Sequence, residues 1–296
     1  MAKEITPTVT FPPLVLSPSR AKKWVRCKKE YYWRYNQKLV KFRKSMMPTL
    51  GLTVGEALAE YYGVVTGQRS SEVLSLLTEK VITIKEPKAL RENDKAEWEK
   101  IKGISRTVLS RYHPWALTKD NFTVDTIEQP YEISLGTSGN PPREIRLLAI
   151  PDAVVITNND HIRLIFEHKL RSRYRTGDFG FDYQSAACCL VAVAAGTLFN
   201  IIKYKNLKFE RELIIRSDYE VNYFANLFLT IGHEILTTPP ECMYPMPMKR
   251  CACEYFELCM AEKDGADVQD IIDSYFVTST YKVETTPIET KEVEEE

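Results

Sequence analysis

The sequence predicts an α/β (α+β) fold, in which a mixed central sheet is flanked by helices and preceded by a helical region. Three observations predict it. Apolar residues recur at helical spacing through much of residues 20–112. Residues 121–169 instead alternate between apolar and polar and are divided by turn residues, which is typical of strands. A further strand-like segment, 208–215, is followed by a helical pattern over 217–237.

The first part of the chain is predicted to be helical after an extended N-terminal segment, residues 1–16, that contains several prolines. Ser17 is a suitable helix N-cap because its hydroxyl can accept a bond from a free backbone N–H of the first turn. The helices are expected at residues 20–37, 51–66, 70–81 and 88–112. The last of them carries an apolar stripe through Trp98, Ile101, Ile104, Val108 and Leu109.

The second part supplies the sheet. Strands are expected at 121–135, 143–156 and 161–169, and the short link "TNND" makes the last two a hairpin. A buried helix is expected over 180–199 and one more helix around 265–276. The expected organisation is one domain, 17–282, with a helical part (17–120), a core (121–241) and a cysteine-rich segment (242–259).

Charge is spread unevenly although the net charge is zero. Residues 283–296 carry six Glu and one Lys and read as a disordered acidic tail. Between Arg20 and Lys44, eleven Lys and Arg residues face the single Glu30, with tyrosines and a tryptophan among them. Cations that neutralise phosphates and rings that stack on bases suit a nucleic-acid surface, although a solvated helix face is an equally good reading of this segment alone.

The chain has no run of 18 apolar residues and no charged N-terminal segment followed by a sustained apolar one. It is therefore expected to be cytoplasmic, or to act in the host cytoplasm if a phage encodes it, without a membrane partner.

The predicted hairpin brings together the residues with the clearest chemistry. Asp152 lies at its first strand, and Glu167 and Lys169 share one face of the second. Two carboxylates at one edge of a sheet can hold a hydrated Mg²⁺, and the lysine can orient or deprotonate a water or stabilise charge on a phosphate. Taken alone, Glu-x-Lys is more often a salt bridge across a strand, so the preceding Pro-Asp carries much of this interpretation.

The seven cysteines are not expected to form disulfides in such a location. Cys188 and Cys189 lie in an apolar helical run and read as small core residues. Cys242, Cys251, Cys253 and Cys259 fall within eighteen residues, which is too tight a cluster for unrelated thiols. Four thiolates suit Zn²⁺ in a tetrahedral site.

Short blocks of the sequence resemble the PD-(D/E)XK nuclease superfamily: "PD" at 151–152 and "EHK" at 167–169. "SPSRAKKWVRCKKEYYWRY" (17–35) and "YQSAACC" (183–189) are similar to the RecB-like nucleases, in the same order along the chain. The resemblance implies a restriction-endonuclease-like core and Mg²⁺ or Mn²⁺ bound by Asp152, Glu167 and the His168 carbonyl. It implies catalytic roles for Asp152, Glu167, Lys169 and Gln184.

Two positions depart from that pattern. The family usually has a metal-binding histidine on an early helix, and the corresponding position is Gly55. The glutamine is usually followed four residues later by tyrosine, and here Cys188 stands at that position. The first departure raises the alternative of a catalytically impaired nucleic-acid-binding module.

The cysteines also resemble those of one subgroup, typified by AddB and the CRISPR-associated exonucleases, with phage relatives. There, one cysteine of an N-terminal helix and three from a C-terminal group hold a [4Fe–4S] cluster. The resemblance implies Cys27, Cys251, Cys253 and Cys259 as ligands, with Cys242 as the substitute for Cys251 and Zn²⁺ as the alternative metal. The cluster would be a structural clamp between the ends of the chain.

The expected function is a metal-dependent DNA nuclease, an exonuclease on single-stranded DNA or DNA ends in recombination, repair or phage DNA processing. A helicase or recombination protein is the expected partner besides DNA. A third reading is a protein–protein adaptor that uses the acidic tail. The residues expected to bind DNA are Arg20, Lys23, Arg26, Tyr31, Arg34, Arg171, Arg173 and Arg175.

Overall fold

The computed structural model describes residues 11–41, 47–87, 92–245 and 253–279. Its helices are α1 (Pro18–Arg26), α2 (Lys28–Tyr31), α3 (Met47–Gly63), α4 (Ser71–Lys85), α5 (Glu92–Leu117), α6 (Tyr183–Ala192), α7 (Asp218–Thr237), α8 (Phe256–Lys263) and α9 (Gln269–Tyr275), with the short segments η1 (Tyr32–Asn36), η2 (Thr66–Gln68) and η3 (Pro240–Cys242). Its strands are β1 (Leu14–Leu16), β2 (Leu39–Lys41), β3 (Phe122–Ile127), β4 (Tyr131–Ser138), β5 (Arg143–Ala149), β6 (Ala153–Thr157), β7 (Arg163–Arg171), β8 (Gly196–Lys203), β9 (Lys208–Ile215) and β10 (Phe276–Thr278).

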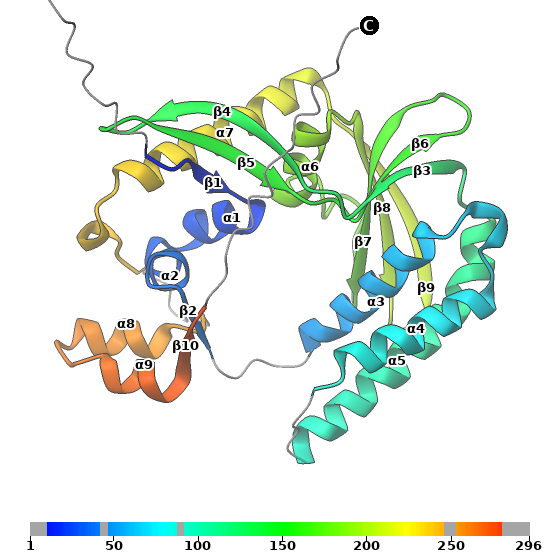
Figure 1. The fold of residues 1–296 in the computed structure, drawn as a ribbon, viewed down its shortest axis with the longest axis horizontal. Helices are drawn as coiled ribbons and strands as arrows, with labels where there is room; N and C mark the ends of the chain where they lie inside the picture. Colours follow the sequence, from blue (N-terminus) through cyan, green and yellow to red (C-terminus); the bar gives the residue numbers. More distant parts are fainter. Residues whose placement is uncertain (1–10, 42–46, 88–91, 246–252, 280–296) are drawn as a thin grey trace, which may run out of the picture.

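A five-stranded sheet in the order β3-β6-β7-β8-β9 forms the centre of the molecule (Figure 1). Its β7 and β8 are parallel and its other neighbouring pairs are antiparallel. A three-stranded sheet, β1-β5-β4, and a two-stranded one, β10-β2, complete the described strands. The predicted mixed α/β architecture is confirmed.

The five-stranded sheet is covered by helices on both faces. On one face α3, α4 and α5 pack on apolar residues of β3, β6 and β7, and the predicted stripe of α5 is buried there. On the other face α6 and α7 pack with α1, and the apolar side chains of β6 and β7 that point this way complete a second core. Alternate residues of β7 therefore belong to different layers, as strand geometry requires.

The predicted helix 20–37 is interrupted at Cys27. Ser17 caps α1 as expected, since its hydroxyl accepts a bond from the N–H of Arg20. Cys27 has extended backbone angles, φ −165° and ψ 112°, and its Sγ accepts the N–H of Glu30 at 3.4 Å. The thiol thereby caps a new helix, α2, so a continuous helix is the wrong prediction here.

Two predicted strands are each divided between two sheets. Segment 143–156 forms β5 in the three-stranded sheet and β6 in the five-stranded one, and segment 121–135 divides in the same way into β3 and β4. The break in the first lies at Ile150-Pro151-Asp152, where proline cannot donate to a ladder. The predicted hairpin survives as β6 and β7, which pair antiparallel.

The predicted helix 180–199 is also wrong in its second half. Helix α6 ends at Ala192, Val193 takes a left-handed conformation (φ 51°), and Gly196 begins β8. The run from Ala186 to Ile202 is apolar and largely buried throughout, so its hydrophobicity does not separate a buried helix from a buried strand.

The described C-terminal residues pack against the start of the chain. Strand β10 pairs with β2, and Tyr255 donates to the carbonyl of Leu39 at 2.7 Å. Lys29 forms a 2.6 Å ion pair with Glu262 of α8. The acidic tail 283–296 lies outside the described residues. Among the described helices, none combines the length and apolarity needed to cross a membrane.

Candidate active site

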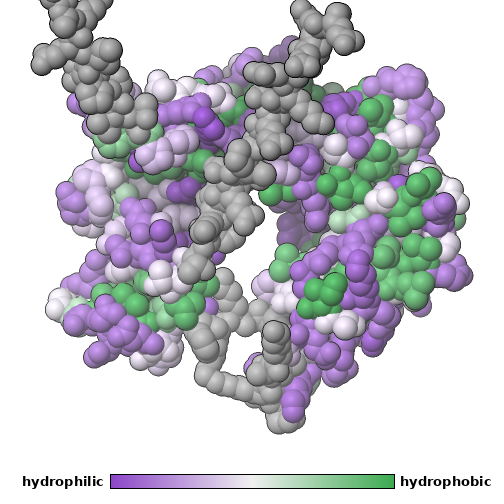
Figure 2. All heavy atoms as spheres, viewed as in Figure 1, coloured by the Kyte–Doolittle hydropathy of each residue, from purple (hydrophilic) through white to green (hydrophobic). Residues whose placement is uncertain are grey.

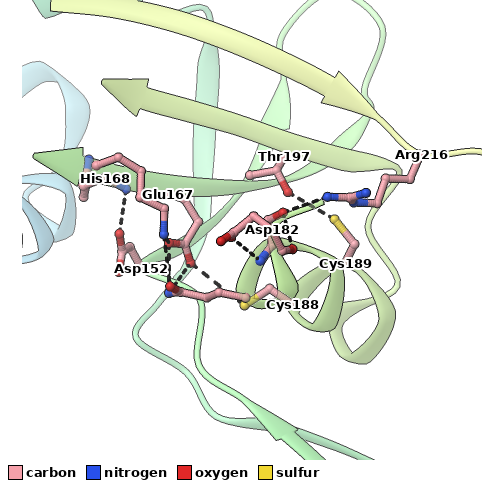
Figure 3. A network of polar contacts seen from close by, with 11 residues as sticks. Asp152, Glu167, His168, Asp182, Cys188, Cys189, Thr197 and Arg216 are labelled. Atoms are coloured by element: carbon pink, nitrogen blue, oxygen red, sulfur yellow. Dashed lines mark hydrogen bonds and ion pairs between the residues drawn. The ribbon is translucent and has the colours of Figure 1, made fainter. Parts of the chain in front are cut away.

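Asp152 and Glu167 meet at the end of the β6–β7 hairpin. Ala153 pairs with Phe166 in the antiparallel ladder, so the next position places Asp152 opposite Glu167, and opposite residues share a face. The carboxylate of Asp152 accepts the backbone N–H of His168 at 2.6 Å, which holds it against β7 (Figure 3). The two predicted carboxylates therefore lie side by side at the same end of two neighbouring strands.

Lys169 and Gln184 complete this polar group. The ammonium of Lys169 lies 3.0 Å from Oε2 of Glu167 and donates to Oε1 of Gln184 at 3.0 Å. The amide of Gln184 donates to both oxygens of Glu167, at 3.1 and 3.0 Å. Gln184 comes from the first turn of α6, so this helix fixes the orientation of the carboxylate and of the ammonium at once.

The site holds ionisable groups in a buried environment. Glu167 is 1% exposed, and burial, followed by the charge of Asp152, raises its pKa to about 8. Burial also raises the pKa of Asp152, although the hydrogen bond from the backbone of His168 acts to lower it. For Lys169, burial opposes the charged form, but the carboxylates of Glu167 and Asp182 outweigh it and raise the pKa. Two neighbouring buried carboxylates repel each other when both are ionised, and a bound dication would offset this repulsion.

This donor set fits a hard divalent cation. Carboxylate and carbonyl oxygens are the ligands that Mg²⁺ takes, and it keeps several waters. Among the residues that the structure describes, no three His, Cys, Asp or Glu side chains lie close enough to hold a metal. A metal bound here would be held by the carboxylates of Asp152 and Glu167, with the predicted His168 carbonyl and waters as further ligands.

The ring of His168 belongs to the other layer of the protein. It stacks on Tyr62 at 5.6 Å between centroids, and its Nδ1 lies 2.7 Å from Nδ2 of Asn200. Burial lowers its pKa to about 3, so the ring is neutral. Only the backbone of this residue faces the carboxylates.

The sequence analysis did not assign a role to Asp182, Ser185 or Arg216, which lie near the site. Asp182 caps α6 by accepting the N–H of Ser185 at 3.0 Å, and its charge acts on Glu167 and Lys169. The buried guanidinium of Arg216 donates to Oγ of Ser185 at 2.8 Å and so holds the start of α6 (Figure 3). The Asp-x-x-Ser spacing is a recognisable cap signal, whereas nothing in the sequence links Arg216 to this helix.

Cys188, which stands where the family usually has tyrosine, keeps a contact with the site. Its Sγ lies 3.9 Å from Oε1 of Glu167. Burial, followed by the charge of Glu167, raises the pKa of this thiol well above its usual range. It is therefore a neutral neighbour of the carboxylate.

An open pocket of about 410 Å³ adjoins the site at the end of β7. It is lined by Pro48, Gly51 and Leu52 of α3 and by residues 168–171 of β7. Gly55, one turn further along α3, has open space where a side chain would begin. Figure 2 shows that the described atoms leave a gap between the side formed by α8 and α9 and the side formed by α3, α4 and α5, and Figure 1 shows that β7 ends near it.

The N-terminal residues expected to bind DNA have partners within the protein. Lys23 and Arg26 both bind the buried Glu30, at 2.6 and 2.8 Å. Arg20 donates to the hydroxyl of Tyr31 at 3.1 Å and lies over the ring of Tyr35.

Tyr31 is only 1% exposed, and this corrects the expectation that its ring stacks on DNA bases. A buried ring that packs against Trp24 at 5.1 Å has no free face to offer. Arg34 lies beside the hydroxyl of the buried Tyr255, at the contact with the C-terminal residues. These roles in DNA binding, apart from that of Tyr31, stay predictions.

The second group of cations follows Lys169 along the chain. Arg171 ends β7, and Arg173 and Arg175 follow in the loop that leads to α6. All three side chains are exposed, and within the described residues no ion pair of their guanidinium groups is found. Their position next to Lys169 suits contact with the backbone of a nucleic acid.

The cysteines meet only in part. Cys27 is buried at the α1–α2 junction. The pKa of Arg26 is raised chiefly by its hydrogen bond to Glu30, and Cys253 and Cys27 lie near enough to add to this effect. Cys253 and Cys259 pack against the cluster around Trp33 and Tyr255. Cys242 lies exposed in η3, and Cys251 falls outside the described residues. Residues 253–278 pack against the segment around Trp33 and β2, while the described thiols alone do not form a metal-binding group.

Comparisons with known proteins give one family and two weak structural matches. Two solved structures match the chain at low similarity. A "Putative exonuclease" from Eubacterium rectale matches with a TM-score of 0.43 and 11% identity, over 83% of this chain and 87% of that one. The protein SSO0001 matches with a TM-score of 0.30 and 14% identity, over 66% and 89%. No curated protein matches the chain. The model of the PD-(D/E)XK nuclease superfamily matches residues 15–259, and the chain belongs to this superfamily.

Proposed function

We propose that the protein is a metal-dependent DNA nuclease that acts as an exonuclease on single-stranded DNA or DNA ends. The observation that carries the proposal is the convergence of Asp152, Glu167, Lys169 and Gln184 at the open end of the β6–β7 hairpin. A salt bridge alone would not need the carboxylate of Asp152 on the adjoining strand or a helix that orients both charges. The open pocket at Lys169 and the exposed side chains of Arg171, Arg173 and Arg175 would give a strand of DNA a path to the site.

The roles of the residues follow from their positions. A Mg²⁺ or Mn²⁺ bound by Asp152 and Glu167 would supply Lewis-acid chemistry for phosphodiester hydrolysis. Gln184 holds the carboxylate of Glu167 in a fixed orientation through both oxygens. Lys169 is placed to donate to the attacking water or to a phosphate oxygen, because its ammonium shares that carboxylate. Arg171, Arg173 and Arg175 would hold neighbouring phosphates.

The direct test is cleavage of end-labelled DNA by the purified chain with Mg²⁺ or Mn²⁺. Single strands, blunt duplexes and circular single strands separate the activities. An exonuclease releases short products from linear DNA and leaves the circle intact, whereas an endonuclease linearises the circle. Absence of cleavage with either ion, at protein concentrations that bind the DNA, would contradict the proposal.

Gly55 favours a second candidate, a nucleic-acid-binding module that has lost catalysis. The usual histidine is missing, and open space stands in its place. This reading predicts salt-dependent DNA binding without turnover in the same assay. The retention of all four converging side chains favours the nuclease.

Metal binding is expected to be visible as stabilisation that grows with pH. The pKa of Glu167 is raised on folding to about 8, so its ionisation destabilises the folded state increasingly between pH 4.5 and 8. A dication removes this penalty. Mg²⁺ at 100 times its dissociation constant should therefore raise the melting temperature by about 5 °C at pH 8, and by less at pH 6, as measured by differential scanning fluorimetry.

Glu167→Gln should abolish this pH-dependent response to Mg²⁺. The control Glu144→Gln, which changes an accessible carboxylate paired with Arg146 in the other sheet, should leave it intact. An equal response to Mg²⁺ in both variants would show that the ion binds elsewhere.

We also propose that Cys27, Cys251, Cys253 and Cys259 bind a [4Fe–4S] cluster, with Zn²⁺ as the alternative. The proximity of Cys27 and Cys253 to one guanidinium supports it. So does the packing of the C-terminal residues against β2 and the α2–η1 segment. Such a cluster would be a structural clamp between the N-terminal and C-terminal parts of the chain.

Cys27→Ser is expected to remove bound iron and labile sulfide from anaerobically purified protein and to lower its melting temperature. Cys242→Ser, at an exposed thiol outside the packed group, should retain both. Loss of iron in Cys242→Ser would assign the fourth position to Cys242 instead of Cys251. Zinc without sulfide in the parent protein would favour the alternative metal.

The expected pathway is recombination, repair or phage DNA processing, with a helicase or recombination protein as the partner that delivers DNA. These assignments rest on the resemblance alone and stay predictions.

A further inference from the structure

The loop between β7 and α6 leaves one large aromatic side chain in the solvent. Phe181 is 83% exposed, the largest exposed fraction of any phenylalanine described in the structure. Burying a phenyl group stabilises a protein by about 2 kcal/mol relative to leaving it in water. A phenyl left outside beside a candidate active site therefore points to a partner that covers it.

The rest of this loop is anchored to the sheet. Tyr174 stacks on Phe179 at 5.4 Å between centroids and 17° between planes, and Phe179 stacks on Phe199 of β8 at 4.4 Å and 21°. Arg171 lies over the ring of Phe179 and Lys203 over that of Tyr174. Two of the three aromatic residues of the loop thus fix its path, and the third is presented outward from a supported backbone.

Phe181 is close to the converging side chains along the chain. It precedes the helix cap Asp182 and lies three residues before Gln184, which contacts both Glu167 and Lys169. Three residues span at most about 11 Å. Stacked nucleotides advance about 3.4 Å each along a strand. The ring is therefore within reach of a base no more than about three nucleotides from the phosphate at the site.

The surroundings of Phe181 are suited to a polyanion. In residues 171–182 the exposed Arg171, Arg173 and Arg175 outnumber the two acids. Both acids, Asp178 and Asp182, accept backbone N–H groups of the protein. A ring for a base and cations for the phosphates on either side of it are the two elements of a single-strand binding surface.

We propose that Phe181 stacks on an unpaired base next to the scissile phosphate and so selects single-stranded DNA or a frayed end. This inference rests on the proposed nuclease function and adds the surface that chooses the substrate. Inside a duplex both faces of each base are already stacked, so the ring finds a free face only where the strand is unpaired. A protein partner covering Phe181 is the competing occupant.

Binding separates this proposal from catalysis. Fluorescence anisotropy with a labelled single-stranded oligonucleotide, in the presence of Ca²⁺, measures affinity whether or not the chain cleaves DNA. Phe181→Ala should weaken this affinity about tenfold, the usual effect of losing one stacked base. Phe181→Trp should restore it, and the affinity for blunt duplex should be nearly unchanged by either variant.

Tyr219→Ala is the matched control. Tyr219 is 80% exposed on the first turn of α7 and lies between Asp218 and Glu220. Residues 217–221 contain no lysine or arginine to offset these charges, unlike the connection that carries Phe181. Removal of Tyr219 should leave the affinity for single-stranded DNA unchanged. A loss in Tyr219→Ala as large as that in Phe181→Ala would show general surface adhesion and overturn the proposal.

An abasic residue in the oligonucleotide locates the contact. At one of the three positions next to the cleaved phosphate, it should weaken binding of the parent protein about tenfold and have no further effect on Phe181→Ala. Additive losses at every position, or unchanged affinity in Phe181→Ala, would overturn the stacking role and favour the protein partner. If the parent protein cleaves DNA but Phe181→Ala binds it with unchanged affinity, only this inference is wrong. If Phe181→Ala binds more weakly but the parent protein does not cleave DNA, only the proposed nuclease function is wrong.

Discussion

Lys169→Met is expected to lower the rate of DNA cleavage by about 10²–10³-fold, the usual cost of removing one preorganised donor from a charged transition state. The ammonium lies 3.0 Å from Glu167 and 3.0 Å from Gln184. Among the described residues, no other cation forms an ion pair with Glu167. Methionine keeps the length and the packing of the side chain. The measurement is single-turnover cleavage of end-labelled DNA at saturating Mg²⁺.

A second variant keeps this test independent of folding. Removing one partner of a buried ion pair costs about 3–5 kcal/mol, so Lys169→Met can lose activity through instability alone. Glu167→Gln keeps the shape of the carboxylate, and Lys169 then retains its hydrogen bond to Gln184 and the charge of Asp182. This variant should therefore lose less stability than Lys169→Met and be equally inactive. Lys169→Arg should also remain inactive, because a planar guanidinium does not reproduce the position of a compact ammonium.

Lys80→Ala gives the baseline for these variants. Lys80 lies on α4 and pairs with Glu60 at 2.8 Å, with more than half of its side chain exposed. Full activity is expected. If Lys169→Met and Lys80→Ala cut DNA at the same rate, Lys169 has no part in the reaction and the proposed site is wrong.

The position of the carboxylates and the lysine could be predicted because it depends on local geometry. Strand periodicity alone places Glu167 and Lys169 on one face, and a hairpin with a short link brings Asp152 to the facing strand. Gln184 could be predicted only from the family resemblance, because its contact with Glu167 depends on how α6 packs on the sheet. Arg216, 31 residues from its partner Ser185, depends on tertiary packing and has no local signal.

The cationic N-terminal segment shows what composition alone does not reveal. Eleven cations against one acid suggested a surface for phosphates, yet that acid, Glu30, is buried and binds two of them. Lys29 is buried as well, and its partner Glu262 comes from α8, 233 residues away. Charge balance at this surface is set by residues distant in sequence, which a count within one segment does not include.

The strand β8 was missed because burial on both faces hides its period. Parallel strands covered by helices on both sides read as continuous apolar runs. No polar residue separates the apolar run of α6 from the start of β8. The first polar residues, Thr197 and Asn200, lie within β8 and are themselves buried. The one marker is Gly196, a weak helix former at the position where the strand starts.

Gly196→Ala is expected to destabilise the protein by about 3 kcal/mol, at the upper end for an added methyl group in a packed core. A Cβ at this position would lie 2.2 Å from the carbonyl oxygen of Ile214 and 2.9 Å from the Cα of Ile215. Both atoms belong to the backbone of β9, which pairs with β8 along its whole length. The clash therefore cannot be relieved by a side-chain rotation and must separate the two strands.

The effect should extend to the candidate site, because β8 is the parallel neighbour of β7 and pairs with it at Glu167 and Lys169. Gly196→Ala should lower the melting temperature by roughly 5–10 °C and weaken the stabilisation by Mg²⁺. Gly103→Ala is the matched control, since Gly103 is exposed within α5 and a methyl group there meets nothing. That change should stabilise the protein by about 0.5–1 kcal/mol through helix propensity. Equal melting temperatures for the two variants would mean that β8 and β9 do not approach each other at Gly196, and residues 180–199 could then be the single helix that the sequence suggested.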